Sequence, residues 1–235
     1  MTDRTLLRLH VEAVWQLTLP PLEETLSELV LSASLPVLPP WSLYLGTFGG
    51  EEQVAIWSPK VAPNARVQLL QQAHWAGVAW NSTLRMRHEV AFHAPVVSVE
   101  QQARARQLAR VLDSADSALI EAFEPGSAPY FLHPSHAPCI GVVIAGQLVS
   151  IAHSSRRTPR ACELGINTLE GERRHGYAKA ATTLWTALVE QQGLVPVYSA
   201  FAWNTASLQL AEAVGYTPAI TGVYGPMPEG GEDTE

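Results

Sequence analysis

The segment between residues 161 and 193 constrains the fold most, because it joins a strand pattern to a helix pattern through a polar loop. Residues 161–168 predict a buried strand, and residues 169–175 predict the loop. Apolar residues then recur from Ala178 to Val189 at the i, i+3, i+4, i+7 spacing of a helix. A strand that leads through a loop into a helix is typical of an α/β protein.

The loop before this helix has the features of an anion site. The first four N–H groups of a helix have no internal acceptor, and the helix dipole adds about half a positive charge there. A phosphate at that position satisfies both. Gly176 lets the phosphate approach the backbone, and Ala178 is small for the same reason. Local positive charge comes from Arg173, Arg174 and Lys179.

Other glycine-rich phosphate motifs do not fit the loop. It lacks the G-x-x-x-x-G-K-[ST] pattern of ATP-binding loops and the G-x-G-x-x-G pattern of dinucleotide-binding units. Taken alone, the loop leaves a solvated basic turn before a helix as an equal alternative.

Composition excludes several classes of protein. Hydrophobic residues make up 47% of the chain and charged residues 16%, which predicts a packed core and argues against disorder. The net charge of −7 disfavours nucleic acid and anionic membranes as partners. Two cysteines make neither a disulfide framework nor a zinc site. We see no signal-peptide pattern and no apolar run of about 18 residues, so we expect a cytoplasmic protein with no membrane partner.

The remaining patterns predict alternating helices and strands. We expect a helix among the leucines of residues 11–35, starting near Pro20-Pro21, and a helical region over residues 99–123. Further expected helices cover residues 64–80 and 205–214, and expected strands cover residues 41–48, 53–57, 84–93, 140–145, 148–152, 195–203 and 216–223. This order predicts an α/β fold with a mixed, mostly antiparallel central sheet and helices on both faces. We divide the chain into an N-terminal α/β region (1–95), a second domain (96–225) and a flexible acidic tail (226–235).

Two short motifs resemble the signatures of the GNAT (GCN5-related) N-acetyltransferase superfamily. The acetyl-CoA loop of that family reads [QR]-x-x-G-x-[GA], and Arg173, Gly176 and Ala178 fit it. A second signature, Asn-x-x-Ser at the start of a helix that ends in Gly-Phe or Gly-Tyr, is matched by Asn204, Ser207 and the Gly215-Tyr216 pair. The resemblance covers roughly residues 100–222. It is nearest to a branch with an extra N-terminal half, which implies either a degenerate GNAT-like half or a small α/β cap in residues 1–95.

The resemblance implies a fold, an activity and a set of binding residues. The fold is GNAT-like, and the activity is direct transfer of an acyl group from acetyl-CoA, the co-substrate, to a primary amine of a small molecule or peptide. Backbone N–H groups of the strand at residues 166–168 would hold the thioester oxygen. The residues expected to contact the cofactor are Ile166, Asn167, Thr168, Arg173, Arg174, His175, Gly176, Tyr177, Ala178, Lys179, Asn204 and Ser207.

Catalytic roles follow from the resemblance less directly. Glu163 is the candidate general base, with a hydrogen-bonded or substrate-orienting glutamate as an equal alternative. Many family members protonate the leaving thiolate with a tyrosine, but this chain has Leu210, Ala211 and Glu212 at the corresponding places. Either Ser207, a bridging water or Tyr216 would protonate the thiolate in place of that tyrosine, or the thiolate would leave unassisted.

Several alternatives stay open at this point. The chain could be a catalytically weak acyl-CoA-binding module or a partner-binding module, and it could form a homodimer. His133 and His136 resemble a metal pair, but the intervening proline and the lack of a nearby third ligand lead us to expect no metal. Residues 154–157 are interpreted as a solvated loop between two strands.

Overall fold

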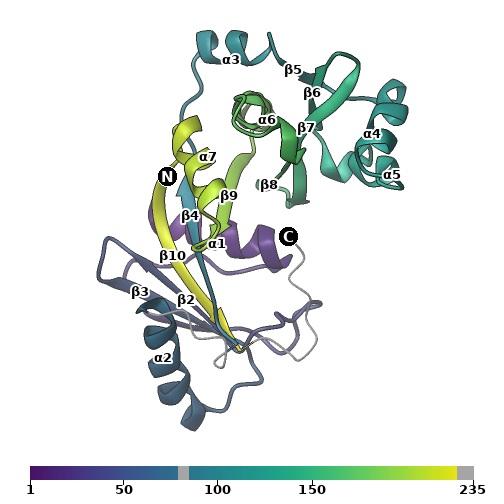
Figure 1. The fold of residues 1–235 in the computed structure, drawn as a ribbon. Helices are drawn as coiled ribbons and strands as arrows, with labels where there is room; N and C mark the ends of the chain where they lie inside the picture. Colours follow the sequence, from purple (N-terminus) through teal and green to yellow (C-terminus); the bar gives the residue numbers. More distant parts are fainter. Residues whose placement is uncertain (79–84, 227–235) are drawn as a thin grey trace. The chain divides into compact units, whose positions relative to one another are not determined.

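The structure is a computed structural model that describes residues 1–78 and 85–226 (Figure 1). The chain divides into two compact units. Unit 1 comprises Met1–Phe92, Ser199–Thr205 and Pro218–Glu235, and unit 2 comprises His93–Tyr198 and Ala206–Thr217. The division therefore differs from a single boundary near residue 95, because two later segments return to unit 1. Of the tail assigned to residues 226–235, only residue 226 is among the described residues.

Unit 1 is built on strands with a helix on each face. Its helices are α1 (Asp3–Trp15) and α2 (Pro63–Val78), and its strands are β1 (Glu28–Val30), β2 (Leu43–Phe48), β3 (Glu52–Trp57), β4 (Arg87–His93) and most of β10 (Thr217–Gly225). β2 pairs antiparallel with both β3 and β10, whereas β1 pairs parallel with β3. Residues alternate along β2, so Tyr44 packs in the cluster with Leu7 of α1, and Leu45 packs in the cluster with Ala73 of α2.

The helix expected over residues 11–35 is wrong. The helix of this region is α1, which begins after Thr2, whose side chain accepts a hydrogen bond from the N–H of Thr5. It ends at Gln16, which adopts a left-handed conformation with a φ of 52°. The described residues 17–27 contain no helix. Leu22 and Leu26 still pack in the core cluster of α1. The leucine spacing therefore indicated which side chains are buried, but not that the segment is helical.

Unit 2 has an antiparallel series of strands with one parallel strand added. Its strands are β5 (Ala109–Val111), β6 (Ile140–Ile144), β7 (Gln147–Arg157), β8 (Ala161–Thr168) and the start of β9 (Val195–Phe201). Neighbours pair antiparallel from β5 to β8, and β9 pairs parallel with β8. Its helices are α3 (Val99–Ala105), α4 (Ser117–Phe123), α5 (Ala128–Phe131), α6 (Tyr177–Gln191) and α7 (Thr205–Val214), with short 3-10 turns at η2 (Ser114–Asp116), η3 (Pro134–His136) and η4 (Glu170–Glu172).

The strands of unit 2 separate two apolar clusters. On one face, Leu184 and Trp185 of α6 pack in a cluster with Ala152 and Cys162. On the other face, Ile120 of α4 and Phe131 of α5 pack in a cluster with Leu148 and Ile151 of β7. Figure 1 shows α6 on one side of β6–β8 and the α4–α5 pair on the other. The predicted mixed, mostly antiparallel α/β fold with helices on both faces is therefore confirmed.

The helical region expected over residues 99–123 is interrupted. Ser98 and Gln101 form a capping box that starts α3, but the helix ends at Arg106. The chain then forms β5, and the N–H of Leu112 donates to the carbonyl of Cys139 just beyond the β5–β6 register. Pairing with β6 therefore overrides the helical pattern in this segment. Among the helices that the structure describes, none combines the length and the apolarity needed to cross a bilayer.

Candidate acyl-transfer site

β8 pairs with β7 along nearly all of its length, but it pairs with β9 only at its start. The register with β7 runs from Cys162 to Thr168. The parallel register with β9 joins only Ala161–Glu163 to Val195–Val197 within the described residues. Backbone N–H and C=O groups of the later part of β8 are thus available on the β9 side to hold another hydrogen-bonding group. The residues expected to hold the thioester oxygen, 166–168, lie in this part of the strand.

The two faces of β8 have different surroundings. Leu164 and Ile166 pack against the apolar cluster of α6. Because side chains alternate along a strand, Glu163, Gly165 and Asn167 point to the opposite face, on which α4 and α5 pack against the neighbouring strand β7. The candidate base and helix α6 therefore lie on opposite sides of the same strand.

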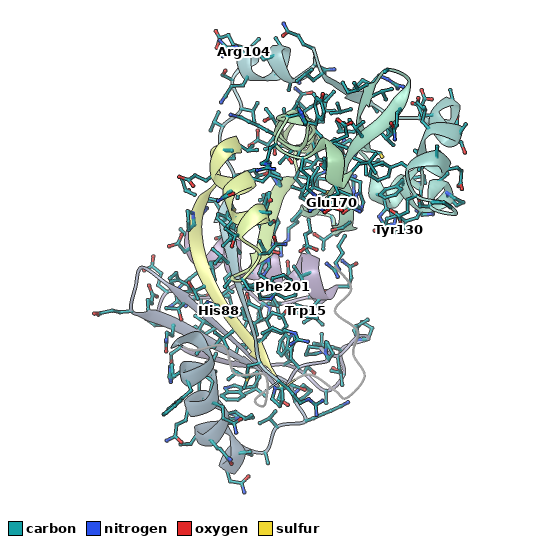
Figure 2. All side chains as sticks on the ribbon, viewed as in Figure 1. Trp15, His88, Arg104, Tyr130, Glu170 and Phe201 are labelled. Atoms are coloured by element: carbon teal, nitrogen blue, oxygen red, sulfur yellow. The ribbon has the colours of Figure 1, made fainter. Side chains whose placement is uncertain are left out.

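The loop after β8 ends in a tight left-handed turn at the start of α6. Figure 2 labels Glu170, in the 3-10 turn that opens this loop. Arg174 has a φ of 67° and Gly176, the N-cap of α6, has a φ of 83°. In the described chain, no side chain caps this end of the 15-residue helix, and its first turn carries no acidic residue. The start of α6 therefore keeps the partial positive charge of an open helix end.

Gly176 is required by its backbone conformation. A Cβ atom added there would meet no described protein atom within 4 Å, so packing does not exclude a side chain. The positive φ does, because only glycine adopts it without strain. The exposed side chains of Arg173, Arg174 and His175 surround the turn, and the His175 ring stacks on Tyr177 with centroids 5.5 Å apart.

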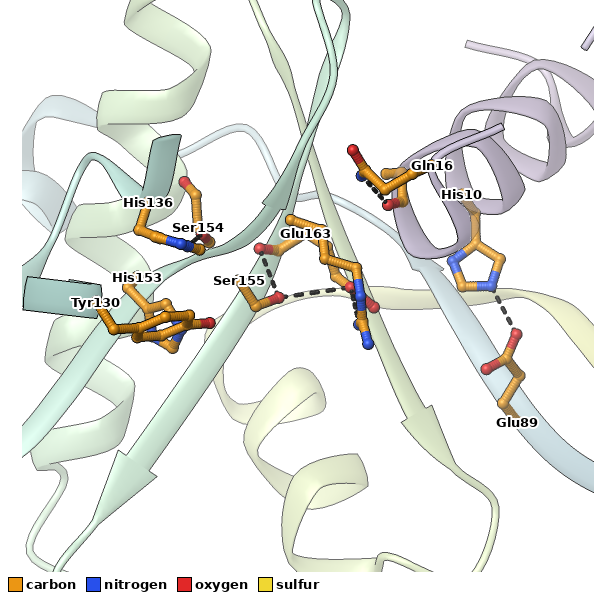
Figure 3. A network of polar contacts seen from close by, with 11 residues as sticks. His10, Gln16, Glu89, Tyr130, His136, His153, Ser154, Ser155 and Glu163 are labelled. Carbon is orange, nitrogen blue, oxygen red and sulfur yellow. Dashed lines mark hydrogen bonds and ion pairs between the residues drawn. The ribbon is translucent and has the colours of Figure 1, made fainter. Parts of the chain in front are cut away.

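Glu163 is held by two residues of β7. Its Oε2 accepts a hydrogen bond from Nη1 of Arg156 at 2.6 Å and lies 3.4 Å from the hydroxyl of Ser155 (Figure 3). The β7–β8 register shifts between Ser154 and Arg156, and this irregularity brings both residues to Glu163. The Glu163 side chain is 8% exposed. The expected solvated loop over residues 154–157 is wrong, since all four residues belong to β7.

Three ring side chains gather on the same face of β7 and β8. They are Tyr130 of α5, His136 of η3 and His153 of β7 (Figure 3). His153 is buried, which lowers its pKa to about 4 because burial and the nearby His136 disfavour a charged imidazole. Burial raises the pKa of Tyr130, and the charge of Arg156 partly offsets this rise. The sequence patterns did not single out Tyr130 or His153, and they placed Arg156 in a solvated loop.

The second signature lies at the start of α7. The Tyr198 hydroxyl donates to the backbone carbonyl of Ser207 at 3.0 Å, and its oxygen lies 3.0 Å from the Ser207 hydroxyl. Burial raises the pKa of Tyr198 to about 12, against a smaller lowering effect of Ser207. Asn204 directly precedes α7, as a helix cap would, and belongs to unit 1.

Tyr216 occupies the core of unit 2. It is 2% exposed, and its hydroxyl lies 2.7 Å from that of Thr186 on α6. Burial raises its pKa, although the Thr186 hydrogen bond acts in the opposite direction. This environment favours a packing role for Tyr216 over proton donation.

His133 and His136 each have a hydrogen-bonding partner. Nδ1 of His133 lies 2.6 Å from the Ser135 hydroxyl, and Nδ1 of His136 lies 2.9 Å from the carbonyl oxygen of Ser154. Among the described residues, no group of three or more His, Cys, Asp or Glu side chains could hold a metal ion.

Comparisons with known proteins identify a family and several solved structures that this chain is similar to. A family model described as GNAT acetyltransferase matches residues 97–221. No curated protein matches the chain. One similar solved structure is a GNAT-family protein from Novosphingobium aromaticivorans, which is 20% identical over 60% of this chain and 64% of that chain, with a TM-score of 0.45. Another is a GCN5-related N-acetyltransferase-like protein from Streptococcus suis, which is 17% identical over 72% of this chain and 70% of that chain, with a TM-score of 0.46. A GNAT-family acetyltransferase from Colwellia psychrerythraea is 17% identical over 59% of this chain and 55% of that chain, with a TM-score of 0.47. The chain thus spans less than two thirds of the N. aromaticivorans and C. psychrerythraea proteins.

Proposed function

We propose that this chain, which belongs to the GNAT acetyltransferase family, is an N-acetyltransferase that moves an acetyl group from acetyl-CoA directly to a primary amine of a small molecule or peptide. One observation carries the proposal. The end of β8 that lacks a β9 register leads, through the left-handed turn at Gly176, into the uncapped start of α6. An extended thioester arm and a pyrophosphate need these two features in this order.

The start of α6 is the proposed pyrophosphate site. Backbone N–H groups of Tyr177, Ala178 and Lys179 provide the donors, and Gly176 permits close approach. Arg173 and Arg174 supplement the helix dipole with charge that solvent screens. Gly176 is therefore expected to matter more for CoA affinity than either arginine.

The second half of β8 is the proposed site of the thioester. Its backbone N–H groups at residues 166–168 would donate to the carbonyl oxygen, which becomes negatively charged when the amine attacks. Glu163, on the face opposite α6, would accept the proton that the amine loses, directly or through one water. The carbon–nitrogen bond then forms, and the carbon–sulfur bond breaks with its electron pair on sulfur.

The Ser207 hydroxyl is the proposed donor to the leaving thiolate. Tyr198, which no sequence pattern singled out, donates its own proton to the Ser207 carbonyl, so the Ser207 hydroxyl proton would turn from the Tyr198 oxygen to the sulfur as the thiolate forms. The hydroxyl would stabilise the thiolate by a hydrogen bond, and solvent would supply the final proton. The proposed transfer uses no metal. A cytoplasmic location is part of the proposal, because both cysteines are buried free thiols that suit a reducing compartment.

Two measurements test the proposal. CoA should raise the melting temperature of the protein, and acetyl-CoA with a panel of amines should release CoA thiol. We would use neamine, spermidine and a peptide with an N-terminal alanine as acceptors. Binding without thiol release would favour the alternative of an acyl-CoA-binding module. The absence of a thermal shift would refute the donor site itself.

A further inference from the structure

Tyr130, His136 and His153 form a compact group, here called the ring group, on the Glu163 face of unit 2. The Tyr130 and His136 rings have centroids 4.0 Å apart, and the Tyr130 oxygen lies 3.3 Å from Nε2 of His153. Phe131 contacts the His153 ring edge-on, with centroids 4.8 Å apart. Figure 3 shows the ring group beside β7, which is the strand that carries both His153 and Ser155.

The position of His153 is fixed by the pairing of β7 and β8. His153 is the register partner of Gly165. A Cβ atom on Gly165 would overlap Cε1 of the imidazole and would lie only 2.7 Å from its Nε2. The ring therefore lies directly against the backbone of β8, in the part of the strand that extends beyond the β9 register. Gly165 is needed to admit it.

The imidazole of His153 stays neutral at ordinary pH. Only 5% of the residue is exposed, and burial together with the nearby His136 lowers its pKa to about 4. A neutral imidazole has one nitrogen that accepts a hydrogen bond. The Tyr130 oxygen lies 3.3 Å from Nε2 of His153, and in the tautomer with the proton on Nδ1 this nitrogen would accept a hydrogen bond from the Tyr130 hydroxyl.

Tyr130 presents its oxygen on the side of Glu163. The residue is 44% exposed, and the charged groups that act on its phenol are Arg156, Glu124 and Glu163. In that tautomer the phenol proton would be directed to His153, which would leave the phenol oxygen able to accept a hydrogen bond from a ligand. The Ser155 hydroxyl and the Glu163 carboxylate add further oxygen atoms on this face. Several oxygen acceptors beside an aromatic wall suit a group with several N–H donors and a positive charge.

We propose that Tyr130 is an acceptor-binding residue whose phenol oxygen accepts an N–H from a primary alkylammonium group, and that His153 is the positioning residue that orients this phenol. The inference rests on the proposed function, because it assumes that the acceptor amine approaches β8 from the Glu163 side. It identifies the acceptor class as a flexible alkyl amine that is protonated when it binds.

Binding of n-butylammonium to the CoA-loaded protein tests the inference without requiring turnover. The titration is followed through the side-chain ¹⁵N signals of His153 and, in variants without this residue, by calorimetry. Tyr130→Phe should weaken binding about tenfold, as expected for one lost hydrogen bond to a charged group. Tyr224→Phe in unit 1, where Tyr224 stacks on Tyr44, is the matched control and should leave the affinity unchanged.

Variants of His153 separate positioning from packing. His153→Gln keeps a hydrogen-bond acceptor and should retain most of the affinity, whereas His153→Phe fills a similar volume without an acceptor and should lose about as much as Tyr130→Phe. The double variant Tyr130→Phe/His153→Phe should bind no more weakly than either single variant, because both remove one interaction. Thermal melting of each variant confirms that it is folded.

The outcomes distinguish the inference from the proposed function. Unchanged n-butylammonium affinity in Tyr130→Phe overturns the inference, and so does an additive loss in the double variant or a failure of the wild type to bind. Loss of affinity in Tyr130→Phe supports it even if wild-type protein releases no CoA thiol with any amine, a result that would reject only the proposed function. Where an amine does react, Tyr130→Phe should raise its KM about tenfold and leave the KM for acetyl-CoA unchanged.

Discussion

Gly176 is the residue at which the proposed donor site is most easily broken. Its φ of 83° strains any other residue, and a branched side chain would cover the N–H groups of the first turn. We expect Gly176→Val to abolish CoA binding in calorimetry. Gly171→Val is the matched control, because Gly171 lies in the same loop without a left-handed φ and also has open space around a Cβ atom. Wild-type affinity in Gly176→Val would refute the phosphate cradle.

Arg174 should matter less than Gly176. Its side chain is exposed, so its interaction with a phosphate is screened by solvent and salt. We expect Arg174→Ala to weaken CoA binding without abolishing it, and the loss should shrink as the salt concentration of the calorimetry buffer rises. A loss as large as that of Gly176→Val would contradict a site that depends mainly on backbone donors.

Glu163 is the residue that tests the proposed general-base step. Glu163→Gln keeps the shape of the side chain but removes its basicity, so turnover should fall roughly 10²–10⁴-fold while CoA affinity stays nearly intact. Glu170→Gln, an exposed change in the loop before α6, is the control and should have little effect on thiol release. Unchanged turnover in Glu163→Gln would remove this residue from the mechanism.

At the residue scale, the sequence predicted what depends on local spacing. Gly176 and its neighbours follow one another along the chain, so the turn at the start of α6 could be found from its motif. The contact between Arg156 and Glu163 arises from a register shift between two strands, and Tyr130 reaches His153 from a separate helix. Both contacts depend on tertiary pairing, which leaves no periodic signal in the sequence.

At the scale of elements, the packing of α5 and η3 over β7 should make stability depend on pH. The folded-state pKa of His153 is about 4, below the ordinary value of 6.5. The unfolded chain therefore binds the extra proton first, and stability is lost as the pH falls from 6.5 through 4. A shift of this size corresponds to about 3 kcal/mol.

Urea unfolding at pH 7 and pH 5 measures this loss. The free energy of unfolding should be lower at pH 5, and His153→Gln should reduce the difference between the two values. His133→Gln is the matched control, because His133 lies in a local turn where its ring contacts Ser135. An equal pH dependence in wild type and His153→Gln would show that other groups control acid stability.

Elements with strong local signals were predicted most accurately. The expected ranges for β8 and α7 coincide with the structure, since each pairs a clear pattern with a turn or cap at its ends. The expected helix over residues 11–35 failed because Leu22 and Leu26 are buried by a segment that follows α1 without being helical. β5 was missed because three residues are too few to show a strand period, and pairing with β6 determines their conformation.

At the scale of the whole molecule, the discontinuous units predict that residues 96–235 do not fold correctly alone. β10 lies in unit 1, where Val223 and Tyr224 pair with Leu45 and Tyr44 of β2. A fragment without β2 leaves this apolar strand edge open. We expect the fragment to bind the dye ANS and to melt without cooperativity, and addition of a 1–95 fragment should restore a cooperative transition. A cooperative melt of the fragment alone would contradict this expectation.

The return of β10 to unit 1 also determines when this unit can be completed during synthesis. β2 leaves the ribosome early, but its β10 partner follows only after all of unit 2 has been translated. At roughly 5–20 residues per second, this delay is on the order of ten seconds. One edge of β2 stays without its partner strand throughout that time, so a nascent chain has a window in which chaperones can act and neighbouring chains can add a strand.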